Sequence, residues 1–130
     1  MSITRINPDG LHKSPAFAQG VLVEGGRTLY IGGQNGTDAS GAITGDLAAQ
    51  SEQAARNVLA VVEAAGGGQA DIVKLTILLV EGSDVMAGYQ ASSTVLGDVN
   101  AAVTVAMVRS LGRPEALVEI EAIAALAHVL

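Results

Sequence analysis

The segment from Leu117 to Ala124 places two carboxylates in the most apolar part of the chain. In an extended strand alternate side chains share a face, so Glu119 and Glu121 should lie about 7 Å apart on one side. The opposite face is wholly apolar and consists of Val118, Ile120, Ala122 and Ala124. A carboxylate is rarely buried without a partner, because removing its charge from water is costly. The pair therefore indicates a functional site, a polar network or a subunit contact. A strand with one solvated face is the ordinary alternative.

Composition narrows the classes of function. The chain has 130 residues, the usual size of one domain, and we treat residues 1–130 as a single domain. It has no cysteine, and its two histidines, His12 and His128, stand near opposite ends, so we expect no metal site. The net charge is −6 and the seven cations form no run. We therefore expect no nucleic-acid partner.

The low proportion of charged residues indicates self-association. Charged residues make up 15% of the chain and apolar residues 49%, against a usual charged share of about 25%. We expect the excess apolar surface to be buried between subunits. Residues 1–10 lack the apolar core of a signal peptide and no apolar run is long enough to span a membrane. These observations predict a cytoplasmic protein with no membrane partner.

Hydrophobic periodicity and turn residues predict two helices and six strands. One helix should cover Asp46–Ala65 and end at the glycines that follow, and a second should begin at Ser83 as N-cap and end near Gly97. Strands are predicted over residues 3–6, 16–24, 27–33, 72–80, 101–108 and 117–124, with Gly25-Gly26 as a hairpin turn. After the short first strand the order is ββαβαββ. It implies an α+β fold in which a mixed sheet carries both helices on one face.

Several segments resemble one known family and occur in its order. They are Ser14-Pro-Ala-Phe-Ala-Gln-Gly20, Leu29-Tyr-Ile-Gly-Gly-Gln-Asn-Gly36, the helical stripe of Gln50, Gln53 and Asn57, and residues 71–76 and 118–124. Together they resemble the RidA/YjgF family, also known as endoribonuclease L-PSP-like, over nearly the whole chain. The resemblance implies a chorismate-mutase-like fold, a homotrimer, and small-molecule pockets between neighbouring subunits.

The resemblance also implies a chemistry and a set of site residues. Family members similar to the founding proteins hydrolyse 2-imino or enamine acids to 2-oxo acids and ammonia, and no cofactor is expected. An arginine of the penultimate strand clamps the substrate carboxylate, and a glutamate of the last strand, here Glu119, positions or activates water. The ligand-binding positions implied in this chain are Phe17, Gly32, Gln34, Tyr89, Val103 and Glu119.

The chain departs from the family at most of these positions. The arginine of the family matches Val103, which cannot bind a carboxylate. Lys13 is the one cation that could swing toward the pocket, but we expect it to be a solvated loop lysine. Phe17 takes the place of the family's tyrosine, and Gly32 takes the place of its serine. The position of the family's helix asparagine falls near Tyr89. We therefore expect an apolar pocket and little activity on 2-iminopropionate-type substrates.

Three functions remain open at this stage. The first is a divergent imine or enamine hydrolase or deaminase in which Glu119 handles water. The second is a trimeric small-ligand-binding module without catalysis. The third, an endoribonuclease or translation inhibitor, is disfavoured by the acidity of the chain and by the absence of paired histidines.

Overall fold

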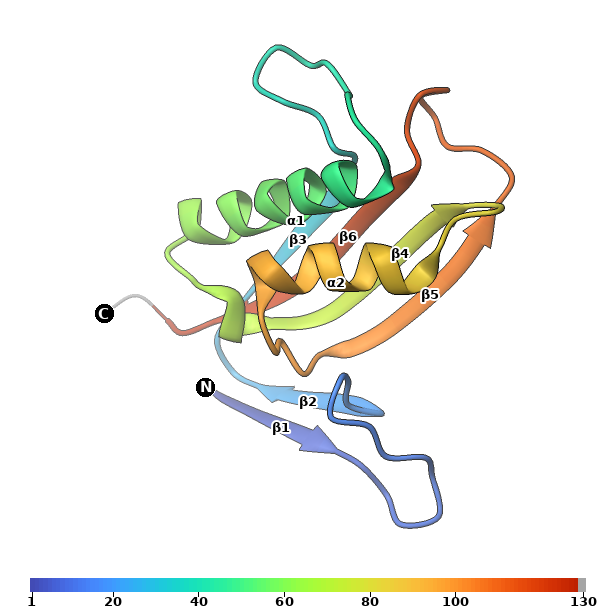
Figure 1. Ribbon diagram of the computed structural model, residues 1–130. Helices are drawn as coiled ribbons and strands as arrows, with labels where there is room; N and C mark the ends of the chain where they lie inside the picture. The colour runs from blue at the N-terminus through green and yellow to red at the C-terminus, as the bar shows by residue number, and fades with distance from the viewer. Residues whose placement is uncertain (129–130) are drawn as a thin grey trace.

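The computed structural model describes residues 1–128 and confirms the predicted α+β fold with a mixed sheet (Figure 1). The element order also agrees with the prediction. The elements are β1 (Ser2–Ile6), β2 (Gly20–Glu24), β3 (Arg27–Gln34), α1 (Leu47–Ala64), the short 3-10 helix η1 (Gln69–Asp71), β4 (Ile72–Val80), α2 (Val85–Leu96), β5 (Ala102–Val108) and β6 (Val118–Leu126). No helix within the described residues is both long and apolar enough to cross a membrane.

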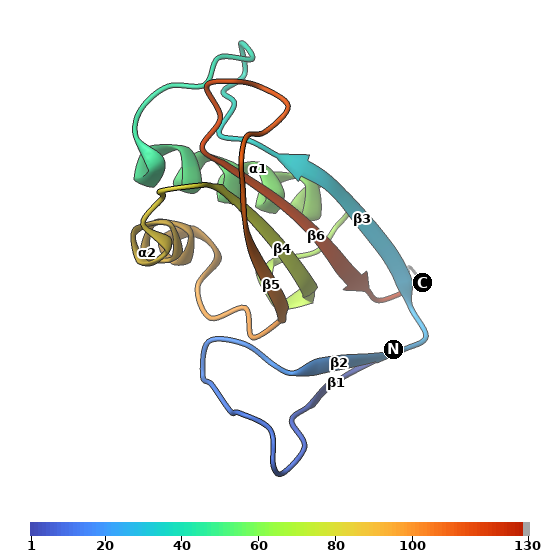
Figure 2. The ribbon, with the colours of Figure 1, turned by 90° about the vertical axis from the view of Figure 1, so that its right-hand side faces the viewer.

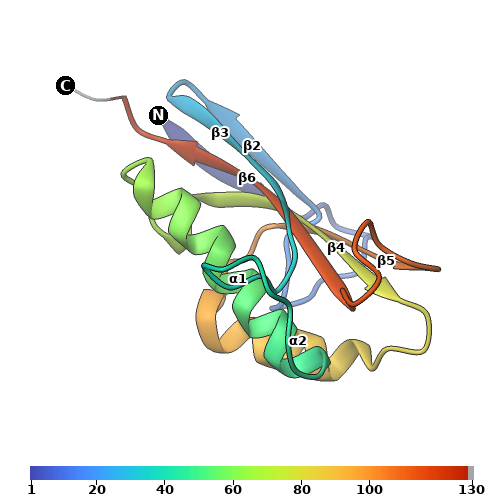
Figure 3. The same cartoon turned by 90° about the horizontal axis from the view of Figure 1, so that it is seen from above.

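The main sheet has the strand order β3-β6-β4-β5. Strands β4 and β5 are parallel, and β6 is antiparallel to both of its neighbours. Helices α1 and α2 pack against each other on one face of this sheet (Figures 2 and 3). We call this the inner face, and the opposite face, which carries no helix, the outer face. The β1–β2 hairpin joins the β5 edge, where the Ala18 amide donates to the Ala101 carbonyl at 2.9 Å.

Both helices begin directly after a capping aspartate. The Asp46 side chain accepts a hydrogen bond from the Ala49 amide at 2.9 Å and starts α1. The N-cap of α2 is Asp84, one residue beyond the predicted Ser83, because the Asp84 carboxylate accepts from the Met86 and Ala87 amides. The side-chain oxygen of an N-cap accepts from amides two or three residues further along the helix, and either Ser83 or Asp84 could supply it.

The prediction for the β2–β3 region is wrong in two respects. Strand β2 begins at Gly20, because the Ser14 hydroxyl accepts from the Ala16 amide and holds the preceding residues in a turn. Strands β2 and β3 are also not paired, since β2 pairs with β1 and β3 with β6. The two glycines between them have φ of 72° and 80°. A Cβ on Gly26 would lie 2.5 Å from the Leu126 carbonyl oxygen, so this turn passes the chain from one sheet to the other.

The core lies between the inner face and the two helices. The predicted apolar face of β6 is confirmed, since Val118, Ile120, Ala122 and Ala124 are all buried. The largest fully buried side chains are Ile72, Leu79 and Ile120, and no aromatic residue of the described chain belongs to the buried core. Small and β-branched side chains thus fill most of the layer beneath α1. The space beneath α2 is filled less completely, as the cavity described next shows.

Candidate active site

The predicted site residues fall into two groups that the sheet separates. Val118 and Ile120 line a cavity on the inner face, so Glu119, which alternates with them on β6, points to the outer face. Gly32 also lies on the outer face, where it borders a shallow depression with Tyr30 and Glu121. Gln34 ends β3 beside this group, and its side-chain amide donates to the Gly32 carbonyl at 3.1 Å. Phe17, Tyr89 and Val103 instead line the cavity on the inner face.

A short series of hydrogen bonds holds the Glu119 carboxylate. Asn35 Nδ2 donates to Glu119 Oε1 at 3.1 Å. The Asn35 carbonyl in turn accepts from Asn57 Nδ2 at 3.1 Å, and Asn57 Oδ1 accepts from Gln53 Nε2 at 2.9 Å. The polar stripe of α1 therefore fixes the turn that positions Glu119. Sequence reasoning named this stripe but overlooked Asn35, although it follows the Gly-Gly-Gln motif directly.

The backbone of β3 is shaped to accept this carboxylate. The register of β3 against β6 shifts between Ile31 and Gln34, which marks a β-bulge. A Cβ on Gly33, within this bulge, would lie 2.7 Å from Glu119 Oε2. Only glycine therefore lets the carboxylate lie against the strand in this position. Glu119 remains half-buried, so it can still reach a water molecule or a ligand.

Gln50 fixes the start of β6 from the other side. Its Oε1 accepts from the Leu117 amide at 2.9 Å, and its Nε2 donates to the Gly45 carbonyl at 3.1 Å and the Glu115 carbonyl at 3.3 Å. Arg113 joins the same end of the sheet by donating to the Gly41 carbonyl and to the Glu115 carboxylate. Hydrogen bonds from its own backbone amide and from Arg113 hold the pKa of the Glu115 carboxyl below its usual value. These bonds anchor both loops that flank the Glu119 end of the site.

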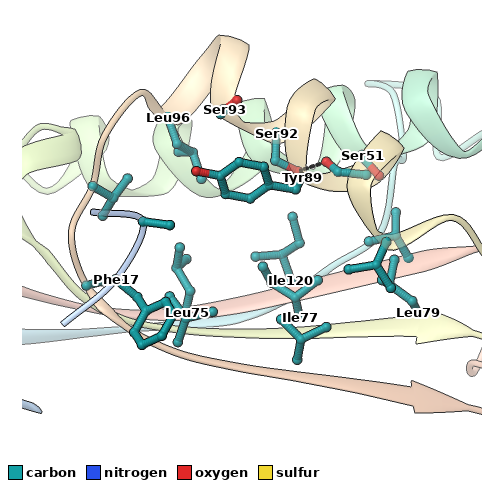
Figure 4. A pocket seen from close by; sticks show the side chains of 18 of the residues that line it. Phe17, Ser51, Leu75, Ile77, Leu79, Tyr89, Ser92, Ser93, Leu96 and Ile120 are labelled. Atoms are coloured by element: carbon teal, nitrogen blue, oxygen red, sulfur yellow. Dashed lines mark hydrogen bonds between the residues drawn. The ribbon is translucent and has the colours of Figure 1, made fainter. Parts of the chain in front are cut away.

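The cavity on the inner face, which we call the α2 cavity, has a volume of about 340 Å³ and lies between α2, β4 and β5 (Figure 4). Leu75, Ile77 and Ile120 form much of its apolar floor. Among residues 1–128, Asp98 is the one charged residue that lines it, and no lysine or arginine does so. The exposed side chains of Met86 and Tyr89 lie at its border, so the cavity is open to the surface. Such a lining offers no favourable charge interaction to a bound anion.

Lys13 is a solvated loop residue, as expected, and it does not line the α2 cavity. Lys13 forms an exposed ion pair with Asp9, with Nζ 3.0 Å from Oδ1. Lys74 is the cation that shares the outer face with Glu121, and its Nζ donates to Thr104 Oγ1 at 2.6 Å. This lysine was not predicted as a site residue, because residues 72–80 were interpreted as a buried strand. Within residues 1–128, no three histidine or acidic side chains are grouped as metal ligands.

The profile of the family described as Endoribonuclease L-PSP matches residues 11–126. The chain belongs to this RidA/YjgF/L-PSP family. It is 31% identical to a RutC family protein of Pyrococcus horikoshii over 104 residues, which cover 78% of this chain and 82% of the relative. It is 38% identical to the 2-iminobutanoate/2-iminopropanoate deaminase of Rattus norvegicus over 71 residues, covering 53% of this chain and 50% of the relative. The chain thus spans about half the length of the deaminase in this match.

Solved structures of the family have the same fold. The Rid family protein YyfB of Yersinia pestis, whose function is described as unknown, superposes with a TM-score of 0.85 at 35% identity, covering 97% of this chain and 100% of that one. The structure of E. coli TdcF with bound serine superposes with a TM-score of 0.71 at 26% identity, covering 93% and 94% of the two chains. The fold expected from the resemblance, an α+β fold with a mixed sheet and two helices, is therefore confirmed by solved structures of the family.

Proposed function

We propose that this protein is a homotrimeric hydrolase of small imines or enamines, with Glu119 as the residue that activates water. The observation that carries the proposal is the held carboxylate: Asn35 fixes one oxygen of Glu119, Gly33 makes room for the other, and the side chain stays half-buried. Water positioned by Glu119 adds to the carbon of the C=N bond and gives a proton to the carboxylate. The carboxylate passes this proton to the nitrogen, which gives a carbinolamine. The carbinolamine hydroxyl then loses its own proton, which also passes to the nitrogen by way of Glu119, the C–N bond breaks, and ammonia leaves a carbonyl product. The deaminase names of the curated relatives support this class of reaction.

The proposed pocket combines the outer face of one subunit with the α2 cavity of its neighbour. Glu119 and Gly32 lie on one face of the sheet, while Phe17, Tyr89 and Val103 lie on the other. A sheet is one backbone thick, so side chains on its two faces cannot meet within one chain. A second copy can bring its α2 cavity to the Glu119 of the first. This arrangement unites all six predicted binding residues in one pocket.

The bare outer face supports assembly. Its residues are largely uncharged and include Tyr30, 76% exposed, together with half-buried Leu78 and Ile123. An apolar sheet face without helices needs another surface to cover it. We therefore expect sedimentation equilibrium at micromolar concentration to give three times the mass of one chain. A monomer under these conditions would contradict both the trimer and the shared pocket.

The lining of the α2 cavity favours substrates that bind through an apolar group. No cation lines the cavity, and Asp98 disfavours an anion there. Loss of a close charge pair costs about 3 kcal/mol, which corresponds to about a hundredfold in rate. We expect turnover of 2-iminopropanoate to be at least about a hundredfold below that of a family deaminase, and the imine of leucine to be the better substrate. Imines generated in situ by an amino-acid oxidase, with oxo-acid release as readout, provide the measurement.

Equal turnover of 2-iminopropanoate by this protein and a family deaminase would contradict that prediction. It would mean that another cation anchors the carboxylate. Lys74 is then the first candidate, because its amine lies on the outer face near Thr104, and Lys74→Ala would test it.

A non-catalytic small-ligand-binding module is the second candidate function. The apolar α2 cavity favours it, since Phe17 supplies no hydroxyl and no cation lines the cavity. Binding of apolar ligands without turnover of any imine would support the module over the hydrolase.

A further inference from the structure

Ser51 has a buried hydroxyl that no protein group within the described residues satisfies. The residue is 1% exposed, and its Oγ has no hydrogen-bond partner. It belongs to the inner stripe of α1 and lines the α2 cavity. Buried polar atoms are almost always paired, because leaving one unpaired lowers the stability of the fold. An unpaired hydroxyl in the wall of a cavity therefore points to a ligand.

The facing helix shows what a buried serine does when it has no such role. Ser92 Oγ donates to the Gly88 carbonyl of its own helix at 2.9 Å, the usual solution for serine within a helix. Ser51 does not bond back to its helix in this way. Its Oγ instead lies toward Gly88, where a Cβ would stand 3.5 Å away. Figure 4 shows Ser51 and Ser92 above the apolar floor that includes Ile77 and Ile120.

Small residues of α2 create the space beside Ser51. Gly88 and Ser92 are one helical turn apart, and both line the α2 cavity. Larger side chains at these positions would fill the gap between α2 and the sheet. The resulting volume of about 340 Å³ lies within the range of small-molecule sites. The rest of the nearby wall is apolar, and Leu79 closes it on the side of β4.

We infer that the inner end of the α2 cavity binds an uncharged, largely apolar group carrying one hydrogen-bonding atom, and that Ser51 Oγ bonds to that atom. Alcohols, ketones, ethers and amides have the required chemistry. The inference rests on the proposed function for the reacting end of the ligand, whereas the binding itself requires no turnover. It extends the proposed pocket by a polar contact within the cavity, on the face of the sheet opposite to the Glu119 carboxylate of the same chain.

Benzyl alcohol and toluene form a suitable pair of probes, because they differ mainly by the hydroxyl group. In methyl-labelled protein, both should shift the resonances of Ile77, Leu79 and Ile120, while those of Ile3 and Ile6 in β1 stay unchanged. Ser51→Ala should weaken benzyl alcohol roughly threefold to tenfold and leave toluene unaffected. Thr94→Ala is the control, since this hydroxyl bonds to its own helix outside the cavity, and it should change neither affinity.

Gly88→Ala tests the same site by filling it. The new methyl group would lie 3.5 Å from Ser51 Oγ and 3.7 Å from Leu79 Cδ2, which are ordinary contacts. An alanine within a helix is also preferred to glycine, so the variant should melt at a higher temperature than the parent. Its affinity for benzyl alcohol should nevertheless no longer exceed its affinity for toluene. A stable variant that cannot bind would exclude misfolding as the cause.

Three results would overturn the inference. The first is that neither probe shifts the methyl resonances of Ile77, Leu79 and Ile120. The second is that Ser51→Ala leaves the ratio of the two affinities unchanged. The third is that oligomers of labelled and unlabelled chains show a side chain of a second subunit inside the cavity and that no probe enters it. Probe binding with this pattern but no turnover of any imine would contradict the proposed function alone. Turnover without probe binding would contradict this inference alone.

Discussion

Replacement of Glu119 by glutamine is expected to lower the proposed imine turnover by about 10²- to 10⁴-fold while the proposed trimer stays intact. Glutamine keeps the shape of the side chain and can still meet Asn35, whose Nδ2 donates to the carboxylate in the parent. It cannot accept the proton that water loses. The measurement is release of oxo acid from imines generated in situ, with sedimentation of the same samples.

Glu121→Gln is the matched control for this experiment. Glu121 lies two residues along the same strand, on the same outer face, and is exposed beside the shallow depression. No hydrogen bond holds its carboxylate within the described residues, so it is not positioned to activate water, and its replacement should leave turnover within about twofold. If Glu119→Gln falls apart into monomers, Glu119 serves assembly and the hydrolase loses its catalytic candidate.

The sequence was sufficient to predict elements with strong local signals. Helix α1 has a capping aspartate, a regular apolar stripe and glycines at its end, and its bounds, Leu47–Ala64, lie within one residue of the predicted ones at each end. Strand β4 covers the predicted residues 72–80, because a run of β-branched and aliphatic residues has few alternatives. In both cases the signal lies within the element and needs no knowledge of its neighbours.

Features that depend on distant contacts were harder to predict. The Gly25-Gly26 motif suits a hairpin, but β3 pairs with β6, which lies about ninety residues later in the chain. Nothing in the local sequence reveals that partner. The same holds for Asn35, whose role depends on its contact with Glu119 across the sheet.

The division of the site residues between the two faces of the sheet could not be predicted from the sequence either. Val103 was predicted to share a pocket with Gly32 and Glu119, but within one chain it faces the α2 cavity. The face of Val103 depends on its register with Leu75 of β4, and a shift of one residue reverses every side chain of a strand. In this register the outer face of β5 presents Ala102 and Thr104 instead, opposite Lys74 and Thr76.

Gly33→Ala is expected to lower turnover by about a hundredfold, because it displaces the Glu119 carboxylate rather than removing it. A Cβ at position 33 would lie 2.7 Å from Oε2 and 2.8 Å from Cδ of Glu119, so the side chain must move away. A shift of about 1 Å in a catalytic group can cost about a hundredfold in rate. The fold should survive, since the atoms in the way belong to a flexible side chain.

A double-mutant cycle distinguishes this displacement from general damage. If Gly33 acts only through Glu119, Gly33→Ala should change little in the Glu119→Gln background, because no proton acceptor remains there to be misplaced. Gly68→Ala is the control for a glycine replacement, since a Cβ there meets nothing within 4 Å. Additive losses in the double mutant would show that Gly33 serves the fold or the ligand directly. If the double mutant instead loses no more turnover than Glu119→Gln alone, the water-activating step lies at the Glu119 carboxylate, which is held between the bulge of β3 and Asn35.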